Sequence, residues 1–506
     1  MTSTTHTVAT QDGATTAVTL PEVVEVVAGQ VAPATGTLDL VLEHPATGAQ
    51  VGTAVASDPV SVERALAAAD AAHTSGAWSS TTPEERAALL DAIGVALAAR
   101  QGELAALEAF ATGVPLRQTS VVGMIVPGAF HLAAEMLRSG ALLDPPVEGA
   151  AGQPVEVLRL PVGPAVCLVP WNAPAPMAAH KVASALAAGC PTILKPSEYA
   201  PYATTVLGTT VAQVLADAGV DGGVFQLLQG GPGVGGVLVT DPRTRAVSFT
   251  GGAVGGRAVA VACAEKLAAL QLELGGNNPL VVMPDADPAA AAHAAVDLLT
   301  TLNGQWCRAL GRLVVPASMA DEIVRLALER LAALHAGDPL DEASDLGPIV
   351  HSVHRARLET ALEALRAAGG EVHRATTVPE EGNYLAPALV TGVAPQDAVE
   401  EIFGPIATVH PYTDEGEALA IANGTAYGLE GYVVGTDTDR ALAFARRVRA
   451  GEVKVNGSTI MSLHLMTPRP AWGLSGLGEE GTVETIRCFT GARVVGVEGS
   501  FALHGR

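Results

Sequence analysis

Three side chains in this 506-residue chain have the type and setting for covalent chemistry, and the first is Cys307 in LNGQWCRALGR. A free thiol is only a few per cent thiolate at neutral pH, but that thiolate is intrinsically very nucleophilic. A neighbouring cation such as Arg308 lowers the pKa of a thiol and enlarges the reactive fraction. Cys307 is therefore a candidate nucleophile, and the alternative is a buried structural cysteine.

Glu273 and Asn172 are suited to assist such a nucleophile. Glu273 ends the apolar strand expected in QLELGGNNP, between Leu272 and Leu274. Burial there would raise its pKa, as a general base working near neutrality requires. Asn172 lies in the proline-flanked turn VPWNAP, where its amide can donate a hydrogen bond to an oxyanion. An outward-facing carboxylate and a turn-forming asparagine remain the simpler alternatives.

Two further stretches have the pattern of a dinucleotide site. In AVSFTGGAVGGRAVA, Gly251 and Gly256 stand where a strand turns into a helix, whose N-terminus can receive a pyrophosphate. In PTILKPSEYAP, Lys195 and Glu198 follow an apolar strand and can bind the hydroxyls of a nucleotide sugar. Glu198 would repel a 2′-phosphate, which favours NAD over NADP. A plain tight turn and a solvated Lys–Glu pair are the alternatives.

The elements that must position these residues alternate along the chain. A helix begins in TTPEERAALL with Thr82 as N-cap, Pro83 at the first position and Glu85 closing a capping box. VEVLRLPVGPAVCLVPW indicates two strands about a Pro-Val-Gly turn. Helices are then expected over 177–188, 203–217, 287–302 and 319–335, and strands in PTIL, VFQLL, AVSFT, NNPLVVM and RLVV. This βαβ rhythm predicts mainly parallel sheets covered by helices.

Composition narrows the partners and the compartment. The formal net charge of −23 disfavours nucleic acid and anionic membrane surfaces, and no apolar run reaches the length of a membrane span. The five cysteines have no CxxC spacing, so neither a disulfide framework nor a metal site is expected. The start, MTSTTHTVATQDGATT, is no secretory signal and indicates a flexible Thr-rich tail. A cytoplasmic location is expected.

Motifs in a fixed order point to a family. PWN, LKPSE, FTGxxxxG, LELGGNNP and GQxC follow one another, and EEIFGP, NGTAYGL and GEVKVNG lie downstream. Glu273 and Cys307 lie 34 positions apart. From about residue 40 to 495 the chain resembles the aldehyde dehydrogenase superfamily, in its hydrolytic, NAD(P)-dependent branch.

The resemblance implies a catalytic set and a reaction. Cys307 would be the nucleophile and Glu273 the general base, with Asn172 and the Cys307 backbone N–H as oxyanion hole. Lys181 matches a lysine sometimes assigned to proton relay. The thiolate would add to an aldehyde, hydride transfer to NAD would leave a thioester, and water activated by Glu273 would release the carboxylic acid.

The resemblance also implies the cofactor contacts. Lys195 and Glu198 would hold the adenosine ribose, Gly251 would lie near the pyrophosphate, and Glu401 would hold the nicotinamide ribose beside Phe403. The whole expected set is Val169, Pro170, Trp171, Lys195, Pro196, Ser197, Glu198, Gly251, Gly252, Gly256, Leu274, Glu401 and Phe403.

The chain departs from its relatives around the expected substrate pocket. Arg308 and Arg469 replace residues that are usually uncharged, while Ala173 and His180 stand where bulky aromatics are common. Trp306 completes the expected substrate contacts. One hypothesis is that Arg308 or Arg469 pairs with an anionic or polar group of a semialdehyde-type substrate. The alternative is that these arginines face solvent or a subunit contact.

The implied fold is α/β, with a Rossmann-type cofactor domain, an α/β catalytic domain and a small β oligomerisation element. The expected borders are 1–140 with 162–275 for the cofactor domain, 276–480 for the catalytic domain, and 141–161 with 481–506 for the element. A homodimer or homotetramer is expected. Two alternatives to the hydrolytic enzyme stay open, a CoA-acylating relative and a non-catalytic binding protein that kept the fold.

Overall fold

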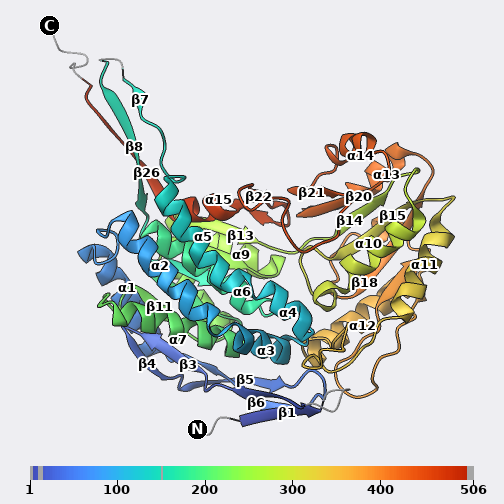
Figure 1. Cartoon of the computed structure of the whole chain (residues 1–506), viewed down its shortest axis with the longest axis horizontal. Coiled ribbons are helices and arrows are strands. Elements are labelled where there is room, and N and C mark those ends of the chain that lie inside the picture. The colour runs from blue at the N-terminus through green and yellow to red at the C-terminus, as the bar shows by residue number, and fades with distance from the viewer. Residues whose placement is uncertain (1–3, 10–14, 150–151, 499–506) are drawn as a thin grey trace.

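The computed structural model describes residues 4–9, 15–149 and 152–498, which form two lobes and a projecting arm (Figure 1). The first lobe is built on an eight-stranded sheet whose five central strands are parallel. In spatial order its strands are β24 (Gly476–Leu477), β13 (Ala269–Glu273), β12 (Ala246–Thr250), β9 (Ala165–Leu168), β10 (Thr192–Lys195), β11 (Phe225–Leu227), β3 (Val24–Val27) and β4 (Gln30–Pro33).

Helices cover both faces of this sheet because its central strands are apolar on both sides. In β9, Ala165 and Cys167 pack into one buried cluster, and Val166 and Leu168 pack into another. The helices of the lobe are α1 (Pro59–Ser75), α2 (Pro83–Ala98), α3 (Gln101–Thr112), α4 (Leu116–Val122), α5 (Ile125–Ser139), α6 (Pro174–Ala188), α7 (Pro201–Asp217), α8 (Pro232–Thr240) and α9 (Ala253–Lys266). The expected capping box of α2 is confirmed.

The second lobe repeats this plan with a seven-stranded sheet that is parallel except at β16. In order its strands are β16 (Glu371–His373), β17 (Ala388–Thr391), β18 (Ile406–Tyr412), β15 (Leu310–Pro316), β14 (Asn278–Val282), β20 (Glu430–Val434) and β21 (Glu452–Val455). Its helices are α10 (Pro288–Thr300), α11 (Ala320–Ala332), α12 (Ser352–Ala367), α13 (Glu415–Ala422) and α14 (Thr438–Ala445). The alternating βαβ rhythm expected from the sequence is confirmed in both lobes.

The arm is an antiparallel sheet of β7 (Val147–Glu148), β8 (Pro154–Pro161) and β26 (Thr490–Gly496), which extends away from both lobes (Figure 1). The two strands expected about the Pro-Val-Gly turn are β8 and β9, and they belong to different sheets. Before β26, α15 (Thr482–Cys488) packs against α6, and β24 joins the first sheet. The domain borders given above stay predictions.

Short antiparallel pairs complete the architecture: β1 (Thr4–Ala9) with β2 (Thr15–Leu20), β5 (Gly36–Glu43) with β6 (Gln50–Ala56), β19 (Tyr427–Gly428) with β23 (Trp472–Gly473), and β22 (Arg469–Pro470) with β25 (Glu479–Glu480). The first pair corrects the expectation of a flexible tail. Thr4 pairs with Leu20 and Ala9 with Thr15, because β-branched threonine favours a strand as readily as a loop. Residues 10–14 of that tail lie outside the described residues.

The stretch Leu116–Ser139 is long and apolar enough to cross a membrane by length and composition, which the sequence analysis did not anticipate. It is interrupted by a turn at 123–124 and is 44% buried in its most apolar window. Its second part, α5, packs against α2 and α6, as a core helix of a globular protein does.

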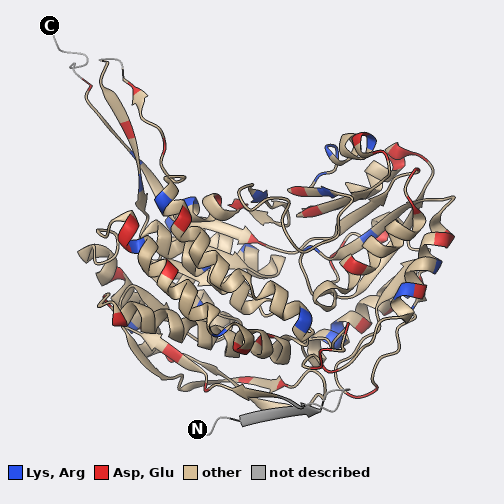
Figure 2. Cartoon of the chain, viewed as in Figure 1, with Lys and Arg blue, Asp and Glu red and all other residues tan. Residues whose placement is uncertain are grey.

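Acidic and basic residues lie mainly on helices and loops (Figure 2), and a charged residue that is buried requires an explanation. Glu108 on α3 is one such group. Its Oε1 accepts the backbone N–H of Ala175 at 2.8 Å, in the first turn of α6, and thereby caps the helix that follows Asn172. Burial raises the pKa of Glu108 from 4.5 to about 8, and the Ala175 hydrogen bond offsets part of that rise.

Replacing Glu108 with Gln should remove this titration while keeping an oxygen for the Ala175 N–H. A carboxyl whose folded-state pKa is raised contributes its full stability below the unfolded pKa and loses it as the pH rises toward the folded value. We expect Glu108→Gln to gain about 3 kcal/mol over the wild type between pH 5 and pH 7.5. Urea unfolding at both pH values measures this, and parallel pH profiles would contradict it.

Candidate active site

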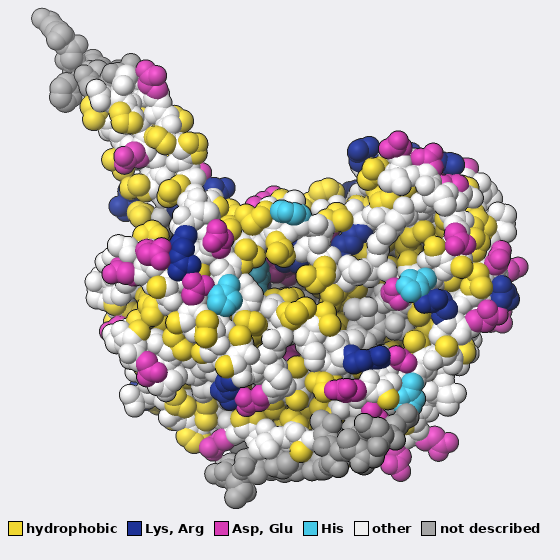
Figure 3. Space-filling model, viewed as in Figure 1, with side chains coloured by type: hydrophobic (Ala, Val, Ile, Leu, Met, Phe, Trp, Pro, Cys, Tyr) yellow, Lys and Arg dark blue, Asp and Glu magenta, His cyan; other side chains and the backbone are white. Residues whose placement is uncertain are grey.

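The sequence-predicted residues meet in a pocket of about 270 Å³ between the two lobes. The space-filling view shows the surface hollowed there, with hydrophobic side chains around the opening (Figure 3). Of the predicted residues, those lining the pocket are Pro170, Trp171, Asn172, Ala173, Gly251, Gly252, Glu273, Leu274, Trp306, Cys307, Arg308, Glu401, Phe403 and Arg469. Cys307 is half-buried, so its sulfur is open to the pocket without lying on the outer surface.

A left-handed turn presents Cys307. Leu302, Asn303 and Gly304 have φ angles of 49°, 56° and 69°, a conformation that is costly for the two residues with a Cβ. The side chain of Asn303 stabilises it by donating to the carbonyls of Gly113 and Pro348 at 2.8 and 3.0 Å. Gly113 ends α3, so the turn depends on a bond to the first lobe.

Residues 305–309, here called the nucleophile loop, carry Cys307. Side chains of the second sheet also hold this loop. Asn278 in β14 donates to the carbonyls of Cys307 and Ala309 at 2.9 and 2.8 Å. The hydroxyl of Tyr432 in β20 donates to the Arg308 carbonyl at 2.8 Å. Three successive carbonyls are thereby engaged, which fixes the backbone that carries the thiol.

The charge state of Cys307 reflects two opposed effects. Burial raises the pKa of its thiol to about 12, even though the neighbouring Arg308 guanidinium acts to lower it. Asn172 reaches the same loop, because its amide donates to the Gln305 carbonyl at 2.9 Å. A donor and a thiol facing one pocket are the components of an oxyanion site.

Glu273 ends β13 and is buried beside a second carboxylate, Glu480. Burial, followed by the charge of Glu480, raises the pKa of Glu273. Glu480 is also penalised by burial, but Arg469, followed by His180, holds its pKa below the usual range. The two buried carboxyls are therefore driven in opposite directions, and Glu273 is the one that can take up a proton near neutral pH.

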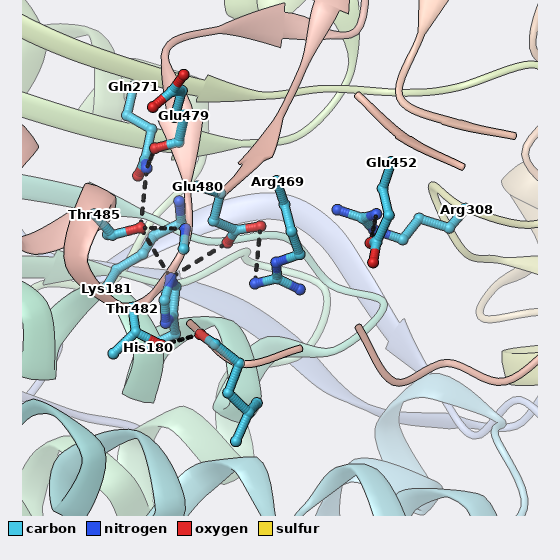
Figure 4. A network of polar contacts seen from close by, with 12 residues as sticks. His180, Lys181, Gln271, Arg308, Glu452, Arg469, Glu479, Glu480, Thr482 and Thr485 are labelled. Atoms are coloured by element: carbon cyan, nitrogen blue, oxygen red, sulfur yellow. Dashed lines mark hydrogen bonds and ion pairs between the residues drawn. The ribbon is translucent and has the colours of Figure 1, made fainter. Parts of the chain in front are cut away.

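A polar network lies behind these carboxyls (Figure 4). Arg469 pairs with Glu480 at 3.4 Å, and His180 lies 3.5 Å from Glu480 and 3.1 Å from the hydroxyl of Thr485. His180 therefore serves this network and does not line the pocket, which corrects its expected place beside the substrate. Lys181 is fully buried and donates to Ser248 at 2.6 Å.

The two arginines of the substrate hypothesis differ in their surroundings. Arg308 is buried and pairs with Glu430 and, at 3.2 Å, with Glu452. Its charge is thus compensated within the protein. Arg469 is partly exposed to the pocket and, in the described part of the chain, makes one ion pair, to Glu480.

The cofactor residues of the nicotinamide side fit a bound dinucleotide. Glu401 accepts the N–H of Gly276 at 2.8 Å, and a Cβ on Gly275 would lie 1.8 Å from its carboxylate, so the glycine pair in LELGGNNP makes room for Glu401. Trp171 packs edge-on against Phe403 at 5.5 Å. Gly252 begins α9, and a Cβ there would meet nothing within 4 Å, which leaves the helix N-terminus open to an anion.

The adenosine side also fits. Lys195 and Glu198 pair at 3.6 Å at the carboxyl end of β10, next to a second pocket of about 360 Å³. Gly231 and Val234 line that pocket, and a Cβ on Gly231 would lie 3.5 Å from Glu198. Its lining is largely apolar but includes Glu63 and Asp241, and binding of a base there stays a prediction.

The remaining predicted cofactor residues are buried. Val169, Pro196 and Ser197 lie at the ends of β9 and β10. Gly256 lies inside α9, where a Cβ would come within 2.5 Å of Leu274, so it permits close packing of helix on strand. A cofactor contact of Gly256 stays a prediction.

Sequence reasoning missed two groups of residues. Glu480 lies far from Glu273 in the sequence, in the run GLGEEG, which by itself gives no sign of this contact. Gly231 and Val234, in the glycine-rich GGPGVGG stretch, show the same kind of strand-to-helix turn as AVSFTGG. Within the described residues, no group of three or more His, Cys, Asp or Glu side chains could hold a metal ion.

Comparison with known proteins agrees with this geometry. The model of the Aldehyde dehydrogenase family matches residues 33–495. A 3-succinoylsemialdehyde-pyridine dehydrogenase from a Pseudomonas species is 34% identical over 447 residues, which cover 86% of this chain and 90% of that relative.

Solved structures share the whole fold. A double mutant of betaine aldehyde dehydrogenase from Staphylococcus aureus, in complex with NAD+, has a TM-score of 0.89 and 26% identity, covering 96% of this chain and 98% of that one. A mutant of aldehyde dehydrogenase C from Pseudomonas syringae, with NAD+ and octanal, has a TM-score of 0.86 and 31% identity, covering 94% and 96%.

Iodoacetamide should alkylate Cys307 before the three buried cysteines, Cys167, Cys190 and Cys263, because Cys307 opens to the pocket. Because Arg308 lowers the pKa of this thiol, Arg308→Gln should slow the alkylation roughly tenfold at pH 8, the effect of about one pKa unit. Arg469→Gln is the matched control and should stay within about twofold, as expected for a more distant charge. Peptide mass spectrometry gives the site and rate, and equal slowing in both variants would contradict the prediction.

Proposed function

The chain belongs to the aldehyde dehydrogenase family, and we propose that it oxidises an aldehyde to the carboxylic acid through a thioester on Cys307. The observation that carries the proposal is that Cys307, Asn172 and Glu273 line one pocket. Bound NAD would supply the hydride acceptor there, held by Glu401 and Phe403 on the nicotinamide side and by Lys195 and Glu198 on the adenosine side.

Each residue has a defined part in this proposal. The Cys307 thiolate adds to the aldehyde carbon, and the amide of Asn172 with the Cys307 N–H stabilises the oxyanion. Loss of hydride from that carbon leaves a thioester on the sulfur. Glu273 then takes a proton from water, whose oxygen attacks the thioester carbonyl and releases the acid and the thiolate. Lys181 and Glu480 surround this base with charge.

Hydrolysis is favoured over transfer to CoA because the raised pKa of buried Glu273 suits a base that activates water. NAD is favoured over NADP because the Glu198 carboxylate faces the adenosine side, where a 2′-phosphate would be repelled.

For the aldehyde itself we propose a polar or anionic, semialdehyde-type substrate with Arg469 as its partner. Arg308 is less suited because Glu430 and Glu452 already compensate it. Ile125, Ile460 and Trp306 give the pocket apolar walls, so the substrate would combine an apolar chain with a polar end. The name of the Pseudomonas relative is consistent with this class.

We further propose a homodimer or homotetramer in the cytoplasm. Val494 and Val495 are 66% and 47% exposed on the arm, which suits a strand that packs against another subunit. All five cysteines are free, which suits a reducing compartment.

Substitutions of Cys307 and of Glu273 should block different steps of the proposed reaction. Cys307→Ala should abolish NADH formation. Glu273→Gln should give one rapid equivalent of NADH and then a rate reduced by about 10² or more, because a general base contributes that much. In the wild type, thioester hydrolysis should rise with pH through the raised pKa of Glu273, since the base must be ionised. Stopped-flow absorbance tests this, and steady turnover of either variant at the wild-type rate would exclude the mechanism.

Arg469→Gln should separate charged from neutral substrates. We expect the specificity constant for succinic semialdehyde to fall about 10- to 100-fold, the value of a charge-assisted hydrogen bond. The constant for butanal should change by less than about threefold, because dispersion contacts remain. The loss of the Glu480 partner affects both substrates alike, so the ratio isolates the substrate contact. Equal losses would remove Arg469 from substrate recognition.

A further inference from the structure

Four buried charges lie directly behind the nucleophile loop. Arg308 pairs with Glu430 and with Glu452, and Lys454 pairs with Glu430 at 3.1 Å. Figure 4 shows Arg308 meeting Glu452 beside the Arg469–Glu480 pair. All four side chains are less than a tenth exposed. Such a cluster loses hydration on folding and is weak evidence for stability by itself, so its position suggests another role.

The two carboxylates among these four charges lie opposite each other in the second sheet, which is unusual. Glu430 and Glu452 are register partners at the first residues of neighbouring strands β20 and β21. Like charges directly opposite one another destabilise a sheet, unless cations lie between or beside them. Arg308 and Lys454 supply those cations, so the four charges form one interdependent unit, here called the charge cluster.

The charge cluster also holds a second segment. The other oxygen of Glu452, Oε1, accepts the backbone N–H of Leu463 at 2.7 Å. Lys454 donates to the carbonyl of Thr459 at 3.0 Å. Both contacts fall within residues 457–467, which connect β21 to β22 and contain neither helix nor strand.

Residues 457–467 have few other anchors in the described part of the chain, namely the bonds from Ser458 to Asp297 and from Thr482 to the Leu465 carbonyl. Leu463 and Leu465 are 64% and 56% exposed, so the segment is not fixed by burial of its apolar side chains. Ile460, however, points into the pocket of Cys307 and lines it. Lys454 and Glu452 bind the backbone on both sides of Ile460 and thereby fix its distance from the nucleophile loop.

We propose that the charge cluster fastens residues 457–467 to the nucleophile loop and so sets the pocket wall against which the aldehyde chain packs. Glu452 and Lys454 are then positioning residues that determine substrate specificity without touching the substrate. The inference rests on the proposed function, because it requires the aldehyde to occupy this pocket.

Lys454→Met tests the proposal, since it keeps the length of the side chain and removes the bond to Thr459. The probes are octanal, whose chain we expect to reach the wall, and propanal, whose chain we expect to be too short to do so. We expect KM for octanal to rise about tenfold, because loss of apolar contact with the wall weakens binding by about that factor. The kcat for both aldehydes and the KM for propanal should stay within about threefold of the wild type. Lys454→Arg retains charge and donors and should restore most of the octanal affinity.

Lys266→Met is the matched control, because Lys266 also donates to a backbone carbonyl, that of Asp241 at 2.5 Å, but lies in the first lobe. It should leave the octanal-to-propanal ratio unchanged. Ile460→Ala, which leaves all four charges in place, should raise KM for octanal in the same way. Hydrogen–deuterium exchange should show faster exchange in residues 457–467 of Lys454→Met than of the wild type.

An unchanged octanal-to-propanal ratio in Lys454→Met would overturn the inference while leaving the proposed function intact. An equal shift in Lys266→Met would also overturn it. Absence of NADH formation by the wild type with either aldehyde would instead contradict the proposed function.

Discussion

Burial of three groups that must carry or acquire negative charge is the constraint on which the site depends. Cys307, Glu273 and Glu480 share a pocket that removes water from each of them, and desolvation is the largest effect on all three pKa values. Arginine side chains beside the pocket offset part of this desolvation. Arg308 lowers the pKa of all three groups, whereas Arg469 is the strongest cation on Glu480 and the second on Glu273.

The two sheets meet in a way that serves this arrangement. The first sheet contributes residues from the carboxyl ends of its parallel strands, where Glu273 ends β13 and Lys195 ends β10. The second contributes the opposite edge, because Glu430 and Glu452 begin β20 and β21 and Cys307 lies just before β15. Groups that work together therefore come from two lobes, and neither sheet holds the catalytic set alone.

Much of this was predictable from local patterns. Apolar runs such as AVSFT and PTIL gave β12 and β10 because parallel strands are buried on both faces. Cys307, Glu273 and Asn172 were candidates because each stands at the end of a strand or in a turn with proline or glycine. Lys181, inside α6, came only from the resemblance. His180 was misplaced because its pocket contact was carried over from aromatic residues of relatives, whereas here its ring meets Glu480 and Thr485. Glu480 and the partners of Arg308 were missed because strand pairing between distant segments leaves no local signal.

The left-handed turn before Cys307 links reactivity to the docking of the lobes. Asn303 donates to a carbonyl at the end of α3 in the first lobe and to another just before α12 in the second. The strained backbone is held only while both acceptors are in place. Partial unfolding of the outer helices would thus release the sulfur from its working position while the second sheet is still folded, and loss of catalysis would precede loss of secondary structure on heating.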